Sequence, residues 1–185
     1  EGSNPSPGTS GRKALRSIQV LTEEVVNLIS AGEVVERPAS IVKELVENSL
    51  DAGASTVEVE IERGGRQSIT VRDDGSGLSR HDLLLCIQRH ATSKITTASD
   101  LENISTLGFR GEALPSIAAV THLTIVSSDG SESGAWKLQV DGGILSGVTP
   151  AARTRGTTIT ASGIFFNQPA RRKFLRSEQT ESSWI

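Results

Sequence analysis

The chain has 185 residues, which suits one globular domain. Hydrophobic residues make up 36% of the sequence and 18 residues are glycine, a composition that excludes a collagen, a coiled coil and a chain disordered throughout. The net charge of −3 argues against general affinity for nucleic acid, the longest apolar run (83–87) is too short to span a membrane, and the single cysteine excludes an internal disulfide.

The start of the chain differs in composition from the rest. Residues 1–17 are rich in Gly, Ser and Pro and are expected to form a disordered tail or tag remnant, which leaves 18–185 as the folded domain. No methionine occurs, not even at position 1, so we expect an engineered or excised piece of a longer protein. No secretory signal is seen, and one cysteine is compatible with a reducing compartment.

Helices are expected early in the chain and strands late. Capping residues, prolines and glycines at the ends of periodic segments predict helices over 22–32, 38–52, 79–89 and 112–120, and a last basic helix within 165–175. Alternating apolar residues predict strands near 55–62, 67–73, 121–128, 134–140, 143–148 and 156–162. The order favours an α/β (α+β) fold with helices on one face of a mixed, mainly antiparallel sheet. Residues 90–111 lack periodicity and are expected to form a long functional loop.

The helix expected at 38–52 carries Glu44, Asn48 and Asp51 beside its apolar stripe. A carboxylate and a carboxamide one turn apart can face one site. There the carboxylate can polarise a water molecule, and the amide oxygen can bind Mg²⁺. The same spacing occurs on ordinary solvated helix faces, so spacing alone leaves both interpretations open.

A second candidate, Asp73 to Gly77 (DDGSG), follows directly after a predicted strand. Two glycines two residues apart let the backbone approach a flat ligand closely. Asp73 can accept a hydrogen bond from an exocyclic amino group such as that of adenine, and it would repel the carbonyl oxygen of guanine. An ordinary strand-to-helix turn would explain the same residues.

A third candidate combines Gly108–Leu114 (GFRGEAL) with Thr92, Ser93 and Lys94 upstream. Glycines flank a predicted helix start, and helix N-termini bind anions through their free N–H groups. Together these residues suit a segment that covers phosphates, although a mobile surface loop has the same composition. Neither a Walker A motif nor G-x-G-x-x-G occurs in the sequence.

The end of the chain is basic. Between positions 150 and 176 there is no acidic residue, and the basic ones are Arg153, Arg155, Arg171, Arg172, Lys173 and Arg176. Such a segment can contact nucleic-acid phosphates or simply form a solvated face. Cys86, within an apolar run, is expected in the core, and the three histidines His81, His90 and His122 lack metal-ligand spacing.

Four motifs occur in order, namely E-x-x-x-N at 44–48, D-x-G-x-G at 73–77, G-x-x-G at 108–111 and G-T-T at 156–158. Together they resemble the GHKL ATPases. The strings AGEVVERPAS, VKELVENSLDAGA, RHATSKI, LGFRGEAL and NQPARRKFL are similar to the N-terminal ATPase domain of MutL mismatch-repair proteins. The resemblance covers residues 18–185 and implies a GHKL (Bergerat-type) two-layer sandwich that holds ATP and Mg²⁺.

The resemblance also implies roles for individual residues. Glu44 matches the general base, Asn48 the Mg²⁺ ligand, and Asp73 with Thr157 the pair that recognises adenine. The other nucleotide-binding positions that it implies are Asp51, Ala52, Gly75, Gly77, Leu78, Thr92, Ser93, Lys94, Leu107, Gly108, Phe109, Arg110, Gly111, Glu112, Ala113 and Leu114.

As a function, the resemblance implies a DNA mismatch repair ATPase whose Mg-dependent ATP binding and slow hydrolysis switch lid ordering and N-terminal dimerisation. The implied partners are DNA, a MutS-type mismatch recognition protein, and a second copy or a paralogue, with no membrane contact. The implied location is intracellular, cytoplasmic in a bacterium and nuclear in a eukaryote. The alternative is a nucleotide-gated DNA-binding or scaffold module with negligible turnover.

Departures from the family pattern are small. Gln168 stands where Thr is common, and Pro115 stands where Ala or Ser is usual. A histidine kinase would carry Asn at position 44 and no ARRKFL segment. The transducer subdomain and the C-terminal dimerisation domain are expected to be absent, so we expect this chain to bind adenine nucleotide, to hydrolyse it poorly and to stay monomeric.

Overall fold

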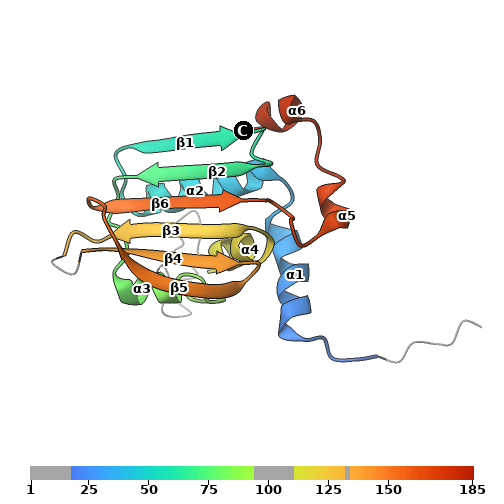
Figure 1. Ribbon diagram of the computed structural model, residues 1–185, viewed down its shortest axis with the longest axis horizontal. Coiled ribbons are helices and arrows are strands. Elements are labelled where there is room, and N and C mark those ends of the chain that lie inside the picture. Colours follow the sequence, from blue (N-terminus) through green and yellow to red (C-terminus); the bar gives the residue numbers. More distant parts are fainter. Residues whose placement is uncertain (1–17, 94–110, 132–133) are drawn as a thin grey trace, which may run out of the picture.

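The computed structural model describes residues 18–93, 111–131 and 134–185 (Figure 1). Within them the helices are α1 (Glu23–Val34), α2 (Pro38–Asp51), α3 (Arg80–Leu85), α4 (Ala113–Val120), α5 (Pro169–Arg172) and α6 (Glu178–Ser182). The strands are β1 (Val57–Glu62), β2 (Ser68–Asp73), β3 (His122–Ser128), β4 (Ala135–Asp141), β5 (Ile144–Ala151) and β6 (Gly156–Ser162).

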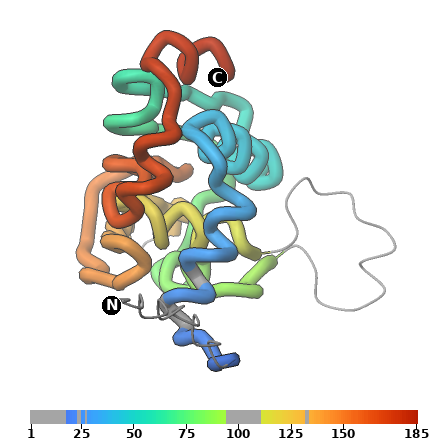
Figure 2. Tube along the Cα trace, turned by 90° about the vertical axis from the view of Figure 1, so that its right-hand side faces the viewer, coloured from blue at the N-terminus to red at the C-terminus, as the bar shows by residue number. Residues whose placement is uncertain are grey.

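The strands form one sheet in the order β1-β2-β6-β3-β4-β5, and each neighbouring pair is antiparallel. Helices cover one face: α2 packs on β1 and β2, α4 on β3 and β4, α3 on β4, and α1 against α4 (Figure 1). The chain then returns through α5 to α6, which lies near β1 and α2 (Figures 1 and 2). The predicted fold class is confirmed.

The core lies between the helices and the covered face of the sheet. Alternate residues of the central strands point into it, as the two-residue period of a strand requires: Ile69, Val71, Leu123, Ile125, Leu138, Val140, Ile159 and Ala161. Ile41 and Leu45 of α2 meet this layer. On the opposite face, Thr70, Thr160 and Thr124 lie in register across three strands. The sheet therefore has one apolar face and one polar face.

Most predicted elements are confirmed by their caps. Thr22 caps α1 by accepting a hydrogen bond from Val25 N at 3.4 Å. Gly53 has φ +70° just after α2, the left-handed position that favours glycine at a helix end. Gly64 and Gly65 adopt the positive φ angles of the predicted β1–β2 hairpin turn.

Two helix predictions are wrong in extent. The helix expected over 79–89 ends at Leu85, and the chain reverses near His90 with φ +61°. Cys86 and Ile87 lie beyond the helix end and still pack against the core. The last basic helix is the four-residue α5, and a separate α6 follows, capped by Ser177, which accepts from Thr180 N at 3.2 Å.

Some predictions lie outside the described residues, including the tail at 1–17 and most of the loop at 90–111. In the ranges that are described, none of the helices combines the length and apolar character needed to cross a bilayer.

Candidate functional site

Strand register brings three polar side chains together at one end of the apolar face. Asp73 of β2 pairs with Thr157 of β6, and Thr157 pairs with Ser127 of β3. These residues continue the rows that contain Val71 and Ile159, so their side chains lie on the helix-covered face. Asp73 is 9% exposed, Thr157 8% and Ser127 not at all. These three buried polar side chains lie at the end of a sheet face that is otherwise apolar.

Hydrogen bonds hold the carboxylate of Asp73 from three directions. Oδ1 accepts from Gly75 N at 3.0 Å and from Thr157 N at 3.2 Å, and Oδ2 accepts from Ser49 Oγ at 3.1 Å. A carboxylate has about four acceptor sites, so Asp73 retains capacity for a further donor. Ser49, Asp73, Gly75, Ser127 and Thr157 are together called the Asp73 corner below.

Ser127 connects the strands to the loop after β2. Its Oγ lies 2.8 Å from Thr157 Oγ1 and accepts a hydrogen bond from Leu78 N at 2.8 Å. The loop that carries Gly75 and Gly77 is therefore fixed to the end of β3. Sequence reasoning missed both Ser49 and Ser127. The only sequence signal for Ser49 is a hydroxyl within the apolar stripe of α2.

The two glycines of this loop make room for the protein itself. A Cβ on Gly77, which has φ +71°, would lie 1.9 Å from Ser128 O, and a Cβ on Gly75 would lie 2.9 Å from Ala52 Cβ. Within the described residues, the close approaches of these glycines are to the end of α2 and to the end of β3. A direct approach of the two glycines to a ligand stays a prediction.

Asp74, next to Asp73, bonds a different part of the chain. Its Oδ1 accepts hydrogen bonds from Thr56 N at 2.8 Å and from Ser55 N at 2.7 Å. These bonds, above all the one from Thr56, lower the pKa of the fully exposed Asp74 carboxyl. Asp74 therefore ties the turn between α2 and β1 to the end of β2, and Asp73 alone is directed into the corner.

The polar row of α2 begins at this corner. Ser76 N donates to Ala52 O at 2.9 Å, so the C-terminal end of α2 is bound to the loop after β2. Asn48 and Glu44 lie one and two turns back from Ala52 along the same side of the helix, and both are half-buried. With a rise of 1.5 Å per residue, the row extends about 12 Å from the corner.

The third predicted group is only partly described. Lys94, Leu107, Gly108, Phe109 and Arg110 lie outside the described residues. Thr92 is half-buried and Ser93 exposed. Gly111, with φ +61°, packs so closely that a Cβ would lie 2.6 Å from Ala91 O. The segments on either side of 94–110 therefore meet.

Glu112, the residue before α4, contacts the same upstream segment. Its Oε2 lies 3.0 Å from both Nε and Nη2 of Arg89, and its Oε1 lies 2.9 Å from His90 Nδ1. The structure thus shows a protein partner for a carboxylate that the resemblance placed at the nucleotide. Ala113 and Leu114 begin α4 behind it.

The basic residues near the end of the chain divide into two that bond inside the fold and four that are exposed. Arg153 is turned inward and donates to Asp73 O at 2.6 Å. Arg171 donates to Gly32 O at 2.9 Å and lies 4.7 Å from the centre of the Phe165 ring. Both guanidinium groups bind main-chain carbonyls, so they serve the fold. The cations left exposed are Arg155, Arg172, Lys173 and Arg176.

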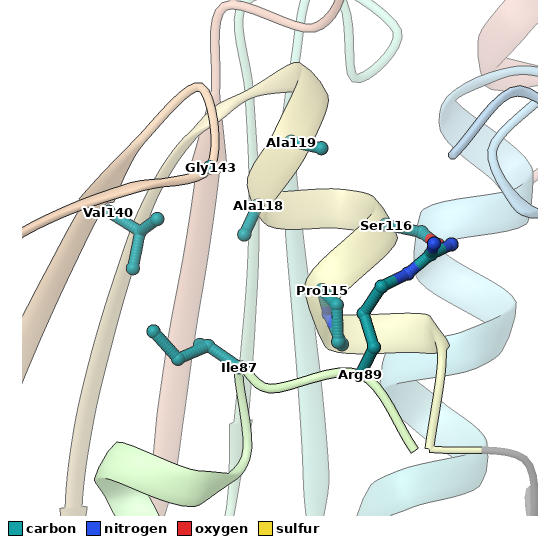
Figure 3. A pocket seen from close by; sticks show the side chains of 8 residues that line it. All are labelled: Ile87, Arg89, Pro115, Ser116, Ala118, Ala119, Val140 and Gly143. Atoms are coloured by element: carbon teal, nitrogen blue, oxygen red, sulfur yellow. The ribbon is translucent and has the colours of Figure 1, made fainter. Parts of the chain in front are cut away.

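A cavity of about 60 Å³ lies beside α4, between the turn after α3 and the β4–β5 hairpin, with Arg89 reaching along α4 toward Ser116 (Figure 3). It is far smaller than the roughly 300–1,000 Å³ of typical ligand pockets. Burial raises the pKa of the Cys86 thiol to about 12. Within the described ranges, no cluster of three or more His, Cys, Asp or Glu could hold a metal ion.

Comparisons with known proteins identify the family to which this fold belongs. Residues 36–152 match the family model described as histidine kinase-, DNA gyrase B-, and HSP90-like ATPase. The chain is 55% identical over 165 residues to DNA mismatch repair protein MutL of Thiobacillus denitrificans, covering 89% of this chain and 28% of that protein. It is 53% identical over 168 residues to MutL of Anaeromyxobacter sp. strain K, covering 91% and 28%.

Solved structures show the same relationship. The ATPase domain of Aquifex aeolicus MutL complexed with ADP aligns with a TM-score of 0.64 and 34% identity, covering 82% of this chain and 52% of that chain. The N-terminal domain of a DNA repair protein aligns with a TM-score of 0.66 and 35% identity, covering 80% and 42%. The chain spans 28% of the length of the MutL relatives named above.

Proposed function

Because this chain belongs to the family of histidine kinase-, DNA gyrase B- and HSP90-like ATPases and resembles the N-terminal ATPase domain of MutL, we propose that it binds Mg-ATP with the adenine in the Asp73 corner and the triphosphate along α2. Bound ATP is hydrolysed to ADP and phosphate. In the whole protein, this cycle serves DNA mismatch repair.

The observation that carries the proposal is the state of Asp73. Its carboxylate is buried and fixed by Ser49, Gly75 and Thr157, yet one more donor can still bind. Burial of a carboxylate costs free energy that hydrogen-bond donors offset. The exocyclic amino group of adenine supplies the donor, whereas guanine presents a carbonyl oxygen that the carboxylate repels. The corner therefore favours ATP over GTP.

In the proposal the metal lies beside the middle of the α2 row. Magnesium is held through few protein groups together with phosphates and waters. The carboxamide of Asn48, one helical turn from the corner, is a suitable hard ligand and needs no further protein cluster. When bound, Mg²⁺ neutralises the phosphate charge and orients the triphosphate.

Glu44, one turn further from the corner, is placed for the water. A carboxylate there accepts the proton of the water that attacks the terminal phosphate, with ADP as the leaving group. Thr92, Ser93, Lys94 and residues 107–114 complete the phosphate contacts in the proposal. Asp51, which ends α2 beside the corner, is a further nucleotide-binding position in the proposal. Contacts of Lys94 and of 107–110 lie outside the described residues.

We further propose how ATP binding serves mismatch repair. ATP binding orders the lid, which is the segment Gly108–Leu114. The domain then pairs with a second copy or a paralogue, and the pair engages DNA and a MutS-type partner. The exposed cations Arg172, Lys173 and Arg176 supply phosphate contacts to DNA. Its place of action is the cytoplasm of a bacterium or the nucleus of a eukaryote. The role rests on the similarity to MutL.

Calorimetric titration with a non-hydrolysable ATP analogue tests the proposal. We expect binding that is stronger with Mg²⁺ than without it, with the Mg²⁺ effect lost in Asn48→Ala. A Glu44→Ala variant should keep binding and lose turnover, measured as phosphate release from a longer chain that includes the following subdomain. Equal, negligible turnover of the longer wild-type chain and its Glu44→Ala variant would identify a nucleotide-gated scaffold instead.

A further inference from the structure

Arg153 lies directly behind the Asp73 corner, in the turn between β5 and β6. Its guanidinium donates through Nη2 to Asp73 O at 2.6 Å and to Thr157 O at 2.9 Å. Its Nη1 donates to Thr158 Oγ1. One side chain thus binds the main chain of both residues that form the last register pair between β2 and β6.

The guanidinium approaches from the side opposite to the proposed nucleotide. Thr158 follows Thr157 in β6, so its side chain lies on the polar face of the sheet. Arg153 bonds the carbonyl of Asp73 and not its carboxylate. The carboxylate oxygens therefore stay with Ser49, Gly75 and Thr157 on the covered face.

Gly156 creates the room for this arrangement. It has φ +119°, and a Cβ there would lie 2.2 Å from Asp73 O and 3.1 Å from Arg153 Nη2. Any larger residue would displace either the end of β2 or the guanidinium. The first glycine of the G-T-T motif thus serves the approach of Arg153 to the strand pair.

The charge of Arg153 also acts on the corner. Burial lowers the pKa of its guanidinium, and the charge of Asp73 opposes that change. An arginine keeps its proton in proteins, so a fixed positive charge lies behind a buried anion. Because the planar guanidinium directs several donors at once, a single ammonium cannot replace all three bonds.

We propose that Arg153 is a positioning residue for base selection, which holds Asp73 and Thr157 at the spacing needed to bind adenine and reject guanine. The inference rests on the proposed function and adds to it a residue outside the motifs. Without Arg153, the ends of β2 and β6 lose their common partner, so Asp73 and Thr157 shift relative to each other. Phosphate contacts along α2 are unchanged, and ATP therefore loses more affinity than GTP.

The test compares two arginines of the same turn. Arg153→Met and Arg155→Met remove the same charge from the full 185-residue chain, but Arg155 is exposed and has no bond to the corner among the described contacts. Affinities for the β,γ-imido analogues of ATP and GTP are measured by calorimetry with Mg²⁺. We expect Arg153→Met to weaken ATP analogue binding roughly tenfold and to lower the ATP:GTP affinity ratio by a similar factor. Arg155→Met should change neither value.

Arg153→Lys guards against a variant that fails to fold. It keeps the charge but offers one nitrogen. If circular dichroism shows that Arg153→Met is folded, the ATP:GTP affinity ratio of Arg153→Lys should lie between those of wild type and Arg153→Met. This inference would be overturned if Arg153→Lys and folded Arg153→Met both kept the wild-type ATP:GTP affinity ratio while Asp73→Ala lost it. That result would leave the proposed function intact. Absence of analogue binding by wild type would overturn both.

Discussion

Asp73 and the basic segment 171–176 are both conspicuous in the sequence, but their side chains differ in burial and in bonding. In the corner, Asp73 is buried and bonded on three sides. In the segment, Arg172 and Lys173 are exposed, and neither side chain joins an ion pair among the described residues. Burial with defined partners identifies a site, whereas a run of like charge identifies only a surface.

The comparison also separates two kinds of arginine that the sequence presents alike. Arg153 and Arg171 bind main-chain carbonyls inside the fold. Arg172 and Arg176 are exposed. Substitutions at the inward positions should change stability or base selection, and substitutions at the exposed positions should change only the binding of anions such as DNA phosphates.

The largest effect on stability is expected at Gly77, in the loop beside the Asp73 corner. Gly77→Ala should lower the free energy of unfolding by about 3 kcal/mol or more, because its Cβ would collide with Ser128 O and φ is positive. Gly53→Ala is the matched control: φ is +70° but nothing lies within 4 Å, so the loss should be about 1 kcal/mol. Urea unfolding measures both. Equal losses would show that the loop can move away from β3.

A smaller loss is expected from the inward arginine of the basic segment. Arg171→Ala removes the bond to Gly32 O and the contact with Phe165, so the free energy of unfolding should fall by about 2 kcal/mol. Arg172→Ala, one residue away, should stay within about 0.5 kcal/mol of wild type. Neither should change the ATP:GTP affinity ratio. A reduced ratio in Arg171→Ala would remove the distinction between the two regions.

The two neighbouring aspartates offer a sharper comparison within one loop. Asp74→Ala should reduce stability at pH 7 but leave analogue affinity unchanged, because Asp74 bonds Ser55 and Thr56 and not the corner. Since the folded-state pKa of Asp74 is lowered from 3.8, its stabilising effect is present above that pH and is lost as the pH falls through the folded pKa. Thermal melts of variant and wild type should therefore converge in acid. A constant difference would contradict this assignment.

The smallest effects are expected from the exposed cations. Lys173→Ala should leave unfolding unchanged within about 0.5 kcal/mol. If it contacts a DNA phosphate, the slope of log affinity against log salt should become shallower by about one. Fluorescence anisotropy with duplex DNA over a range of salt concentrations measures the slope. An unchanged slope would place DNA on another surface.

The sequence predicts the motif residues and the helix of the site better than the contacts between them. Asp73 and Thr157 follow from motifs, and α2 follows from Pro38, Gly53 and an apolar stripe. Contacts made across the fold have no local signal. Ser49 reads as part of a stripe, and Arg153 reads as part of a basic run. Their partners lie 24 and 80 residues away in the chain, so only strand register and packing reveal them.

In the proposed function, adenine recognition depends most on Asp73. Asp73→Asn keeps the size of the side chain but replaces a carboxylate by an amide that can also donate to the guanine carbonyl. Titration with the two β,γ-imido analogues should show ATP affinity reduced by roughly tenfold or more and GTP affinity unchanged or increased. An Asp73→Asn variant that binds the ATP analogue as tightly as wild type, and still rejects the GTP analogue, would contradict the account.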